Sequence, residues 1–221
     1  MALRVVDHFH TLGLPWWAAI VGSTLLVRSA MLPLALRTTA MQAKLAELKE
    51  ELAPLQARAQ ASGGMDPAAM REVQEVYSRH GVAPLQMLAV PLVQMPVFLS
   101  FFIGLRRLAE SFPQAHEGGA FWFVDLGAAD STYALPALSG TTALFLVRLA
   151  MPPPPAAATA AERETHFRMR TLMSALTLVS VPVACTMPAS VLVFWVTNNL
   201  FSLAYSSAVI APAPRAALGL P

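Results

Sequence analysis

One apolar segment dominates the end of the chain: residues 171–214, TLMSALTLVSVPVACTMPASVLVFWVTNNLFSLAYSSAVIAPAP, contain no charged side chain. A membrane-spanning helix needs about 20 mostly apolar residues. The segment is therefore too long for one crossing and predicts two, at about 172–187 and 189–210. Pro188 disfavours helix at the residue before it, so the reversal is expected at Thr186–Pro188. This stretch alone predicts a polytopic α-helical membrane protein.

The composition of the whole chain agrees with a membrane protein. Of its 221 residues 56% are hydrophobic and 13% are charged, and the mean hydropathy is +0.54. A soluble domain carries about 25% charged residues, and a disordered chain is more polar still. The net charge of +2 is too small for a nucleic-acid groove. The single cysteine, Cys185, excludes an internal disulfide and a cysteine-based metal site.

Three more apolar segments are long enough to be spans. They lie at about 14–36, 85–105 and 133–151. The expected fold is thus all-α, with five transmembrane helices. Lysine and arginine are concentrated in the loops at 37–84 and 148–170. The positive-inside rule therefore places these loops and the C-terminus on the cytoplasm-like side, and the N-terminus on the opposite side.

The loop between the first two spans, residues 38–80, is predicted to be a helical hairpin. Apolar residues recur at heptad-like spacing from Met41 to Leu55. Asp66 is a suitable N-cap for a second helix, with Pro67 at its first position. We expect this hairpin outside the membrane, on the same side as the C-terminus. Two interpretations stay open: a solvated spacer, or an arm that docks a partner or an arriving substrate.

Two further segments are expected to lack a fold of their own. Residues 152–161 are rich in proline and alanine and predict a stiff connector. Residues 211–221 form a short tail. The whole chain, 1–221, is then one five-span core with the hairpin inserted in it.

Arg28 lies inside the first expected span. A charged residue there costs about 2.5–3.5 kcal/mol on insertion scales and marks a functional site by default. Arg28 precedes Leu36 by eight residues, which is about 12 Å along a helix. That depth argues against the alternative, a side chain that snorkels to the interface. Since the expected spans contain no Asp or Glu, water, polar side chains or a visiting anion must compensate the guanidinium.

Polar side chains on three of the spans are candidates to surround that arginine. In the last span Trp195, Asn199 and Ser202 share a helix face because they are spaced by four and three residues, and Asn198 lies beside that face. Each one alone is also explained as a hydrogen bond between helices. Together with an arginine they predict a hydrated, one-sided groove. The predicted groove residues are Arg28, Thr24, Gln94, Trp195, Asn198, Asn199 and Ser202.

The function classes can then be compared. An enzyme is not expected, because all five histidines lie outside the expected spans and His8 and His10 lack further metal ligands. We therefore expect no catalytic residue, metal or cofactor. Five spans do not divide into equal transporter repeats. A membrane protein insertase explains each feature, since a hydrated groove shortens the hydrocarbon that a polar segment must cross. The alternative is a small polar-solute channel or transporter.

Several motifs occur in order along nearly the whole chain. They are GLPWW (13–17) followed by Arg28, PLVQMPVF (91–98), WFVDL (122–126) and FWVTNNLFS (194–202). Together they resemble the Oxa/YidC family of membrane protein insertases, and the mitochondrial Oxa branch in particular. A cytochrome-oxidase-assembly paralogue is an alternative within that branch.

The resemblance implies a five-span core with a groove open to the matrix and to lipid, in which Arg28 receives hydrophilic parts of substrates. It implies that 38–80 is a mobile coiled-coil arm and that no ATP or other cofactor is used. The implied partners are nascent or newly made membrane proteins, the lipid bilayer and the ribosome. Ribosome tethering is expected to be weak, since 211–221 holds only Arg215. The implied location is the mitochondrial inner membrane, with the N-terminus in the intermembrane space; a bacterial plasma membrane is the alternative.

Overall fold

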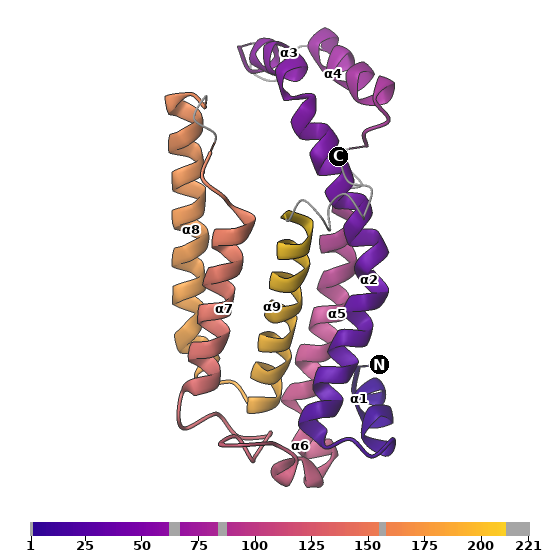
Figure 1. Ribbon diagram of the computed structural model, residues 1–221, viewed down its shortest axis with the longest axis vertical. Helices are drawn as coiled ribbons and strands as arrows, with labels where there is room; N and C mark the ends of the chain where they lie inside the picture. Colours follow the sequence, from indigo (N-terminus) through magenta and orange to yellow (C-terminus); the bar gives the residue numbers. More distant parts are fainter. Residues whose placement is uncertain (1, 62–66, 84–87, 155–157, 211–221) are drawn as a thin grey trace. The chain divides into compact units, whose positions relative to one another are not determined.

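The computed structural model describes residues 2–61, 67–83, 88–154 and 158–210. Helices account for all regular structure in these ranges apart from two isolated bridges. In chain order the helices are α1 (Ala2–Thr11), α2 (Trp16–Glu47), α3 (Lys49–Ala61), α4 (Pro67–Arg79), α5 (Ala89–Arg106), α6 (Leu108–Ser111), the 3-10 helix η2 (Pro113–Glu117), α7 (Ala134–Ala150), α8 (Ala160–Ala184) and α9 (Ala189–Ile210) (Figure 1). The all-α prediction is confirmed for the described residues.

The chain divides into two compact units. Of the described residues, the first contains those within 1–30 and 97–211, and the second contains those within 31–96. Helices α2 and α5 each contribute one part to either unit.

Among the helices of the described residues, α2 and α5 are long and apolar enough to cross a membrane. In the 18-residue apolar stretch of each helix, only 22% is buried in α2 and 11% in α5. A core helix of a soluble protein, in contrast, buries its apolar side chains. Helix α7 is equally apolar but has 17 residues. Helix α9 carries Asn198 and Asn199, and α8 carries Arg168 and Arg170; these polar side chains lower the hydropathy of both helices.

The core of the first unit surrounds the start of α9. Leu192 is fully buried there, and Ile20, Leu105 and Leu126 pack in the same cluster. These residues come from α2, α5 and the segment after η2, so segments distant in the sequence meet at this point. Phe101 of α5 stacks on Phe194 of α9, with ring centroids 5.1 Å apart.

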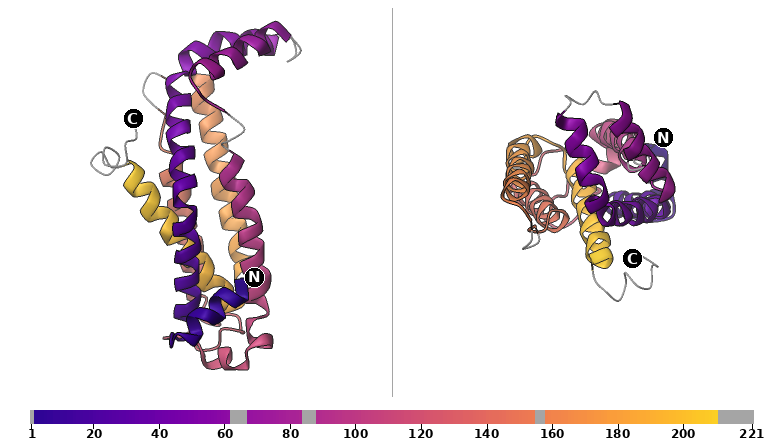
Figure 2. Two further views of the ribbon diagram at one scale, coloured as in Figure 1. Left: turned by 90° about the vertical axis from the view of Figure 1, so that its right-hand side faces the viewer. Right: turned by 90° about the horizontal axis from the view of Figure 1, so that it is seen from above.

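Helix α7 packs on both α8 and α9 (Figures 1 and 2). Gly140 of α7 allows a close approach, because a Cβ atom there would lie 2.6 Å from Cγ2 of Val181 in α8. Helix α8 begins at Ala160, twelve residues before the predicted span at 172. Its start is set by a capping box in which Thr159 and Glu162 bond each other's backbone N–H groups.

The second unit contains α3 and α4, which pack against each other. Leu48, Leu52, Val76 and Val82 form its buried cluster. Residues of the predicted heptad-like seam, Met41, Leu45 and Leu55, pack around that cluster. Arg58 of α3 pairs with Glu72 of α4 at 3.2 Å.

Several segments differ in extent from the sequence expectation. Helix α2 continues through Pro33 to Glu47, because nothing in 37–47 breaks a helix. Helix α4 starts at Pro67 as expected, and its predicted N-cap, Asp66, lies outside the described residues. So do 84–87, at the start of the predicted second span, part of the 152–161 connector, and the 211–221 tail. Helices α1, α6 and η2 were not predicted.

Candidate functional site

Arg28 of α2 contacts the second half of α9. Its guanidinium donates a hydrogen bond to the Ser202 hydroxyl and lies over the ring of Phe201, 5.0 Å from the ring centroid. The Ser202 hydroxyl in turn donates to the backbone carbonyl of Asn198 at 2.9 Å. The half-buried cation thus contacts a hydroxyl and an aromatic face. A guanidinium carries five N–H donors, so it can take part in several hydrogen bonds at once.

Asn199 lies three residues before Ser202, and its side chain contacts α7 rather than α2. Its side-chain amide donates to the backbone carbonyl of Ser139 and to the hydroxyl of Thr142, each at 3.2 Å. Both acceptors belong to α7. Asn199 therefore links α9 to α7, while Ser202 links α9 to Arg28.

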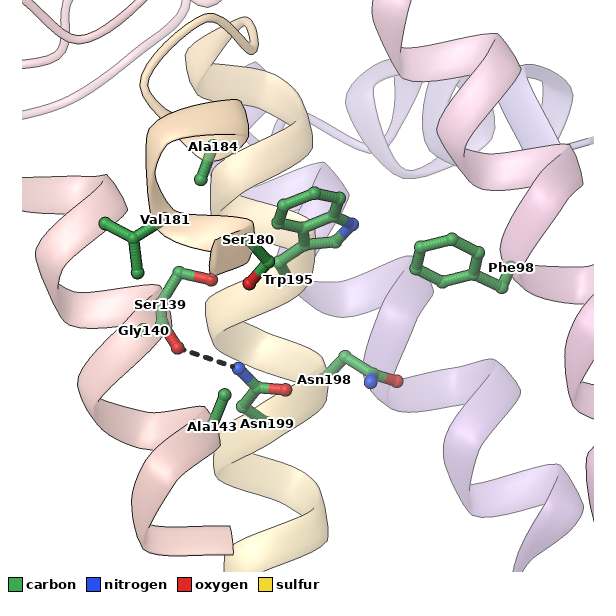
Figure 3. A pocket seen from close by; sticks show the side chains of 10 residues that line it. All are labelled: Phe98, Ser139, Gly140, Ala143, Ser180, Val181, Ala184, Trp195, Asn198 and Asn199. Carbon is green, nitrogen blue, oxygen red and sulfur yellow. Dashed lines mark hydrogen bonds between the residues drawn. The ribbon is translucent and has the colours of Figure 1, made fainter. Parts of the chain in front are cut away.

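Trp195 stands on the side of α9 that faces α5. Its ring stacks with Phe98 and Phe102, with centroid distances of 6.4 and 6.3 Å. Among the described residues, nothing accepts a hydrogen bond from its buried indole N–H, and nothing donates to the buried Oδ1 of Asn198. Figure 3 shows Trp195 directed toward Phe98, and Asn199 directed the opposite way, toward Ser139.

These side chains surround a pocket of about 180 Å³. The pocket lies where α7, α8, α9 and Phe98 of α5 meet, and its lining mixes small, aromatic and amide side chains (Figure 3). Its lining residues are Phe98, Ser139, Gly140, Ala143, Ser180, Val181, Ala184, Trp195, Asn198 and Asn199. The structure thus brings three of the predicted groove residues, Trp195, Asn198 and Asn199, to one pocket.

The two remaining predicted groove residues have different surroundings. Thr24 is buried, and its hydroxyl donates to the backbone carbonyl of Ile20 at 2.7 Å. Its polar atom is therefore satisfied within α2. Gln94 is half-buried in α5 and belongs to the second unit.

The start of α9 is fixed by hydrogen bonds from the segment between η2 and α7. The N–H groups of Ala189 and Ser190 donate to the carbonyls of Ala128 and Leu126, at 2.8 and 3.0 Å. The Ser190 hydroxyl donates to the carbonyl of Leu105, at the end of α5, at 2.9 Å. These bonds set where α9 begins and thereby the register of its polar residues.

Asp130 organises this segment. Its carboxylate accepts hydrogen bonds from the Trp122 indole N–H, the Thr132 backbone and hydroxyl, and the Leu135 backbone, at 2.6 to 3.3 Å. Burial raises the pKa of Asp130, but these hydrogen bonds outweigh it and bring the pKa below its ordinary value. The carboxylate therefore stays charged and ties the start of α7 to Trp122, the first residue of the WFVDL motif.

Asp125 also accepts several hydrogen bonds in this segment, but its side chain is more exposed than that of Asp130. It accepts from Nδ1 of His116 at 2.9 Å and from the backbone N–H groups of Gly127 and Ala128. Burial raises its pKa, and the hydrogen bonds from His116 and the backbone lower it further than burial raises it. The two aspartates make the segment a hydrogen-bonded scaffold.

Sequence reasoning missed three contributors to the site. Ser139 and Thr142 accept from Asn199, and their three-residue spacing inside an apolar span was the signal that could have indicated them. Phe201 underlies Arg28, but an aromatic residue in a membrane span gives no such signal.

Comparison with known proteins identifies the family. The family model described as 60Kd inner membrane protein matches residues 8–214. The mitochondrial inner membrane protein OXA1 of Arabidopsis thaliana is 33% identical over 99% of this chain and 51% of its own length. The mouse mitochondrial inner membrane protein OXA1L gives the same three values. The membrane protein insertase YidC 2 of Bacillus anthracis is 28% identical over 96% of this chain and 79% of its own length.

The chain spans about half the length of the curated mitochondrial relatives that it matches. The match nevertheless covers nearly all of this chain, including Arg28 and all of α9. The chain therefore belongs to the 60Kd inner membrane protein family, which is the Oxa/YidC family that its motifs resemble.

Proposed function

We propose that this protein is a membrane protein insertase. Its substrates are nascent or newly made membrane proteins, and it helps their hydrophilic segments across the bilayer and aids assembly of membrane complexes. The names of the relatives, a membrane protein insertase and mitochondrial inner membrane proteins, support this assignment. The proposed location is a mitochondrial inner membrane, with a bacterial plasma membrane as the alternative.

The contacts and apolar surroundings of the Arg28 guanidinium are the main support for an insertase. The guanidinium rests on a hydroxyl and an aromatic ring, among helices whose leucines and valines are exposed. A cation in such surroundings attracts a negatively charged or polar group more strongly than it would in water. A client segment with acidic residues is such a group, and it can leave again because no covalent chemistry is involved.

The remaining predicted groove residues extend this binding surface. Asn198, Asn199 and Trp195 line the 180 Å³ pocket and offer amide and indole groups to a peptide backbone. Ser202 positions Arg28. Gln94 and Thr24 are proposed to contribute polar surface along the path of the client. Each of these groups lowers the cost of moving an unpaired peptide group out of water.

We propose the following topology for this function. Five spans, formed by α2, α5, α7, α8 and α9, cross the bilayer, with the C-terminus on the matrix side. The pair α3 and α4 stands outside the membrane on that side and meets arriving clients. Its buried cluster and the Arg58–Glu72 ion pair support a folded arm rather than a loose linker. A contact with the ribosome is proposed only for co-translational clients.

The test is insertion into liposomes that contain the purified protein as their only protein. A short single-span client with an acidic N-terminal segment is synthesised in their presence, and protease protection of that segment is measured. We expect protection well above that of empty liposomes. Encapsulated fluorescent dye is followed in the same vesicles, because a polar-solute channel would release it whereas an insertase would not.

Two results would contradict the proposal. The first is protection equal to that of empty liposomes although the protein is folded and correctly incorporated. The second is rapid dye release without client insertion, which would favour the channel.

A further inference from the structure

Helix α1 folds back along the start of α2. Gly13 has a φ of +96°, in the left-handed region that favours glycine, and it reverses the chain between the two helices. The ring of Phe9 lies 3.2 Å from where a Cβ atom of Gly22 would stand, and Leu3 lies 3.1 Å from the corresponding position at Gly104 of α5. Figure 1 shows α1 beside the lower part of α2.

The two sides of α1 differ sharply. Ala2 and Val6 are buried in the core of the first unit, and the Ala2 N–H donates to the Ser100 hydroxyl at 3.4 Å. Arg4 and His8, four residues apart and therefore on one face, are exposed. The core holds α1 in place, while the opposite face stays available.

Arg4 and His8 belong to a pocket with an apolar floor. Val5, Phe9 and Leu26 complete its lining. Within the described residues neither Arg4 nor His8 pairs with a carboxylate; Asp7, on the same helix, is half-buried and bonds to neither of them. The pocket thus presents one permanent cation and one imidazole above apolar carbon.

The pocket lies beside the part of α2 that we assign to the membrane. Leu26 is ten residues into α2, about 15 Å along the helix axis, and it is 53% exposed. Its neighbour Leu25 is 40% exposed. A cationic side chain next to such lipid-facing carbon requires a compensating anion or water.

We propose that Arg4 and His8 bind the phosphate of an anionic phospholipid whose acyl chain lies along Leu26. A guanidinium and an imidazole suit a phosphate oxygen, and the leucine surface suits an acyl chain. A lipid offers both features in one molecule, whereas inorganic phosphate would leave the apolar floor exposed to water. The site is separate from the Arg28 groove and does not depend on insertase activity.

The test uses the full chain in phosphatidylcholine vesicles that contain a small fraction of phosphatidylglycerol bearing a photoreactive diazirine. After illumination, the labelled peptides are identified by mass spectrometry. We expect labelling of the peptides that contain Val5 and Leu26. Arg4→Gln should reduce it about tenfold, the change expected when one charge-assisted hydrogen bond is lost, and Arg4→Lys should retain most of it.

The matched control is Arg107→Gln, which removes an exposed arginine of the same unit at the end of α5 and should leave the labelling unchanged. Equal labelling by a diazirine phosphatidylcholine, an equal loss in Arg107→Gln, or full labelling in Arg4→Gln would each overturn the proposal. Displacement of the lipid by millimolar inorganic phosphate would also overturn it, because the site would then be an anion site without lipid character.

Discussion

The two halves of α9 are built on different principles. Its start, from Ala189 to Phe194, is buried and hydrogen-bonded to the segment before α7 and to the end of α5. Its second half carries Asn198, Asn199 and Ser202 and is partly exposed. It contacts the guanidinium of Arg28 through Ser202. One helix therefore combines a fixed base with a polar, accessible surface. The base sets the position of the polar residues, and the polar half is the proposed contact surface for the client.

This difference separates residues that stabilise the fold from residues that are proposed to contact a substrate. Asp130 bonds to the backbone of Thr132 and Leu135, and Ser190 bonds to the carbonyl of Leu105, so the hydrogen bonds of both residues stay within the protein. Arg28 places a cation among helices with exposed leucines and valines. Substitutions in the two regions should therefore change different measured quantities, and the predictions below are arranged by the size of the expected effect.

The largest effect is expected from Arg28→Ala. It removes the charge proposed to attract clients, and loss of a charge-assisted interaction corresponds to about a tenfold to hundredfold decrease in insertion. The thermal unfolding midpoint in detergent should change little, because removing the side chain also removes the cost of its burial. Initial rates of protease protection in liposomes measure the insertion effect.

The matched control for this prediction is Arg106→Ala. Arg106 also lies over a phenylalanine ring, 5.7 Å from the centroid of Phe102, and it has no proposed role in the groove. Unchanged insertion in Arg106→Ala, beside a loss in Arg28→Ala, would support the comparison. Equal losses in both variants would show that any arginine of the first unit matters, and the distinction between the two regions would fail.

Asp130→Asn should have the next largest effect, and on stability rather than insertion per folded molecule. The amide cannot accept all four hydrogen bonds that the carboxylate accepts. Leaving a buried donor unsatisfied costs about 1–3 kcal/mol, so the denaturation midpoint should fall. Asp125→Asn is the control, because Asp125 is more exposed and its loss should have a smaller effect.

The stabilisation by Asp130 should depend on pH in a defined direction. Its pKa is lower in the folded protein than its ordinary value, so the unfolded chain binds the proton more readily. The stabilisation is present above about pH 4, the ordinary pKa range of aspartate, and is lost as the pH falls through the lowered pKa. Denaturation midpoints of the wild type and Asp130→Asn should therefore converge at acid pH; a constant difference down to pH 2 would contradict this.

The smallest effect is expected from Asn199→Ala. Its two hydrogen bonds to α7 join helices, and such bonds average about 0.6 kcal/mol in membrane proteins. Unfolding of the purified protein should show a destabilisation of that order, with insertion reduced severalfold at most. An effect on insertion as large as that of Arg28→Ala would move Asn199 into the principal client contact.

The sequence was sufficient for the helical class and for the polar character of α9. The predicted segments 133–151 and 189–210 lie within one residue of α7 and α9, because both have sharp ends at a turn or a proline. It did not predict α1, since a ten-residue amphipathic helix is recognised mainly by what it packs on. The sequence also could not predict that Asn199 contacts α7 whereas Ser202 contacts Arg28 of α2. Both residues lie on one face of the same helix, and which neighbouring helix each one meets depends on how the helices pack.

The most direct test of the central claim places a photocrosslinking amino acid at position 202, beside Arg28, and, in a second variant, at position 176. Leu176 lies on α8 and is 55% exposed; it has no proposed contact with clients. During synthesis of a short membrane protein, position 202 should give adducts with the nascent chain and position 176 should not. Equal adducts from both positions, or adducts only from the α3–α4 pair, would contradict the proposal that the polar half of α9 receives the client.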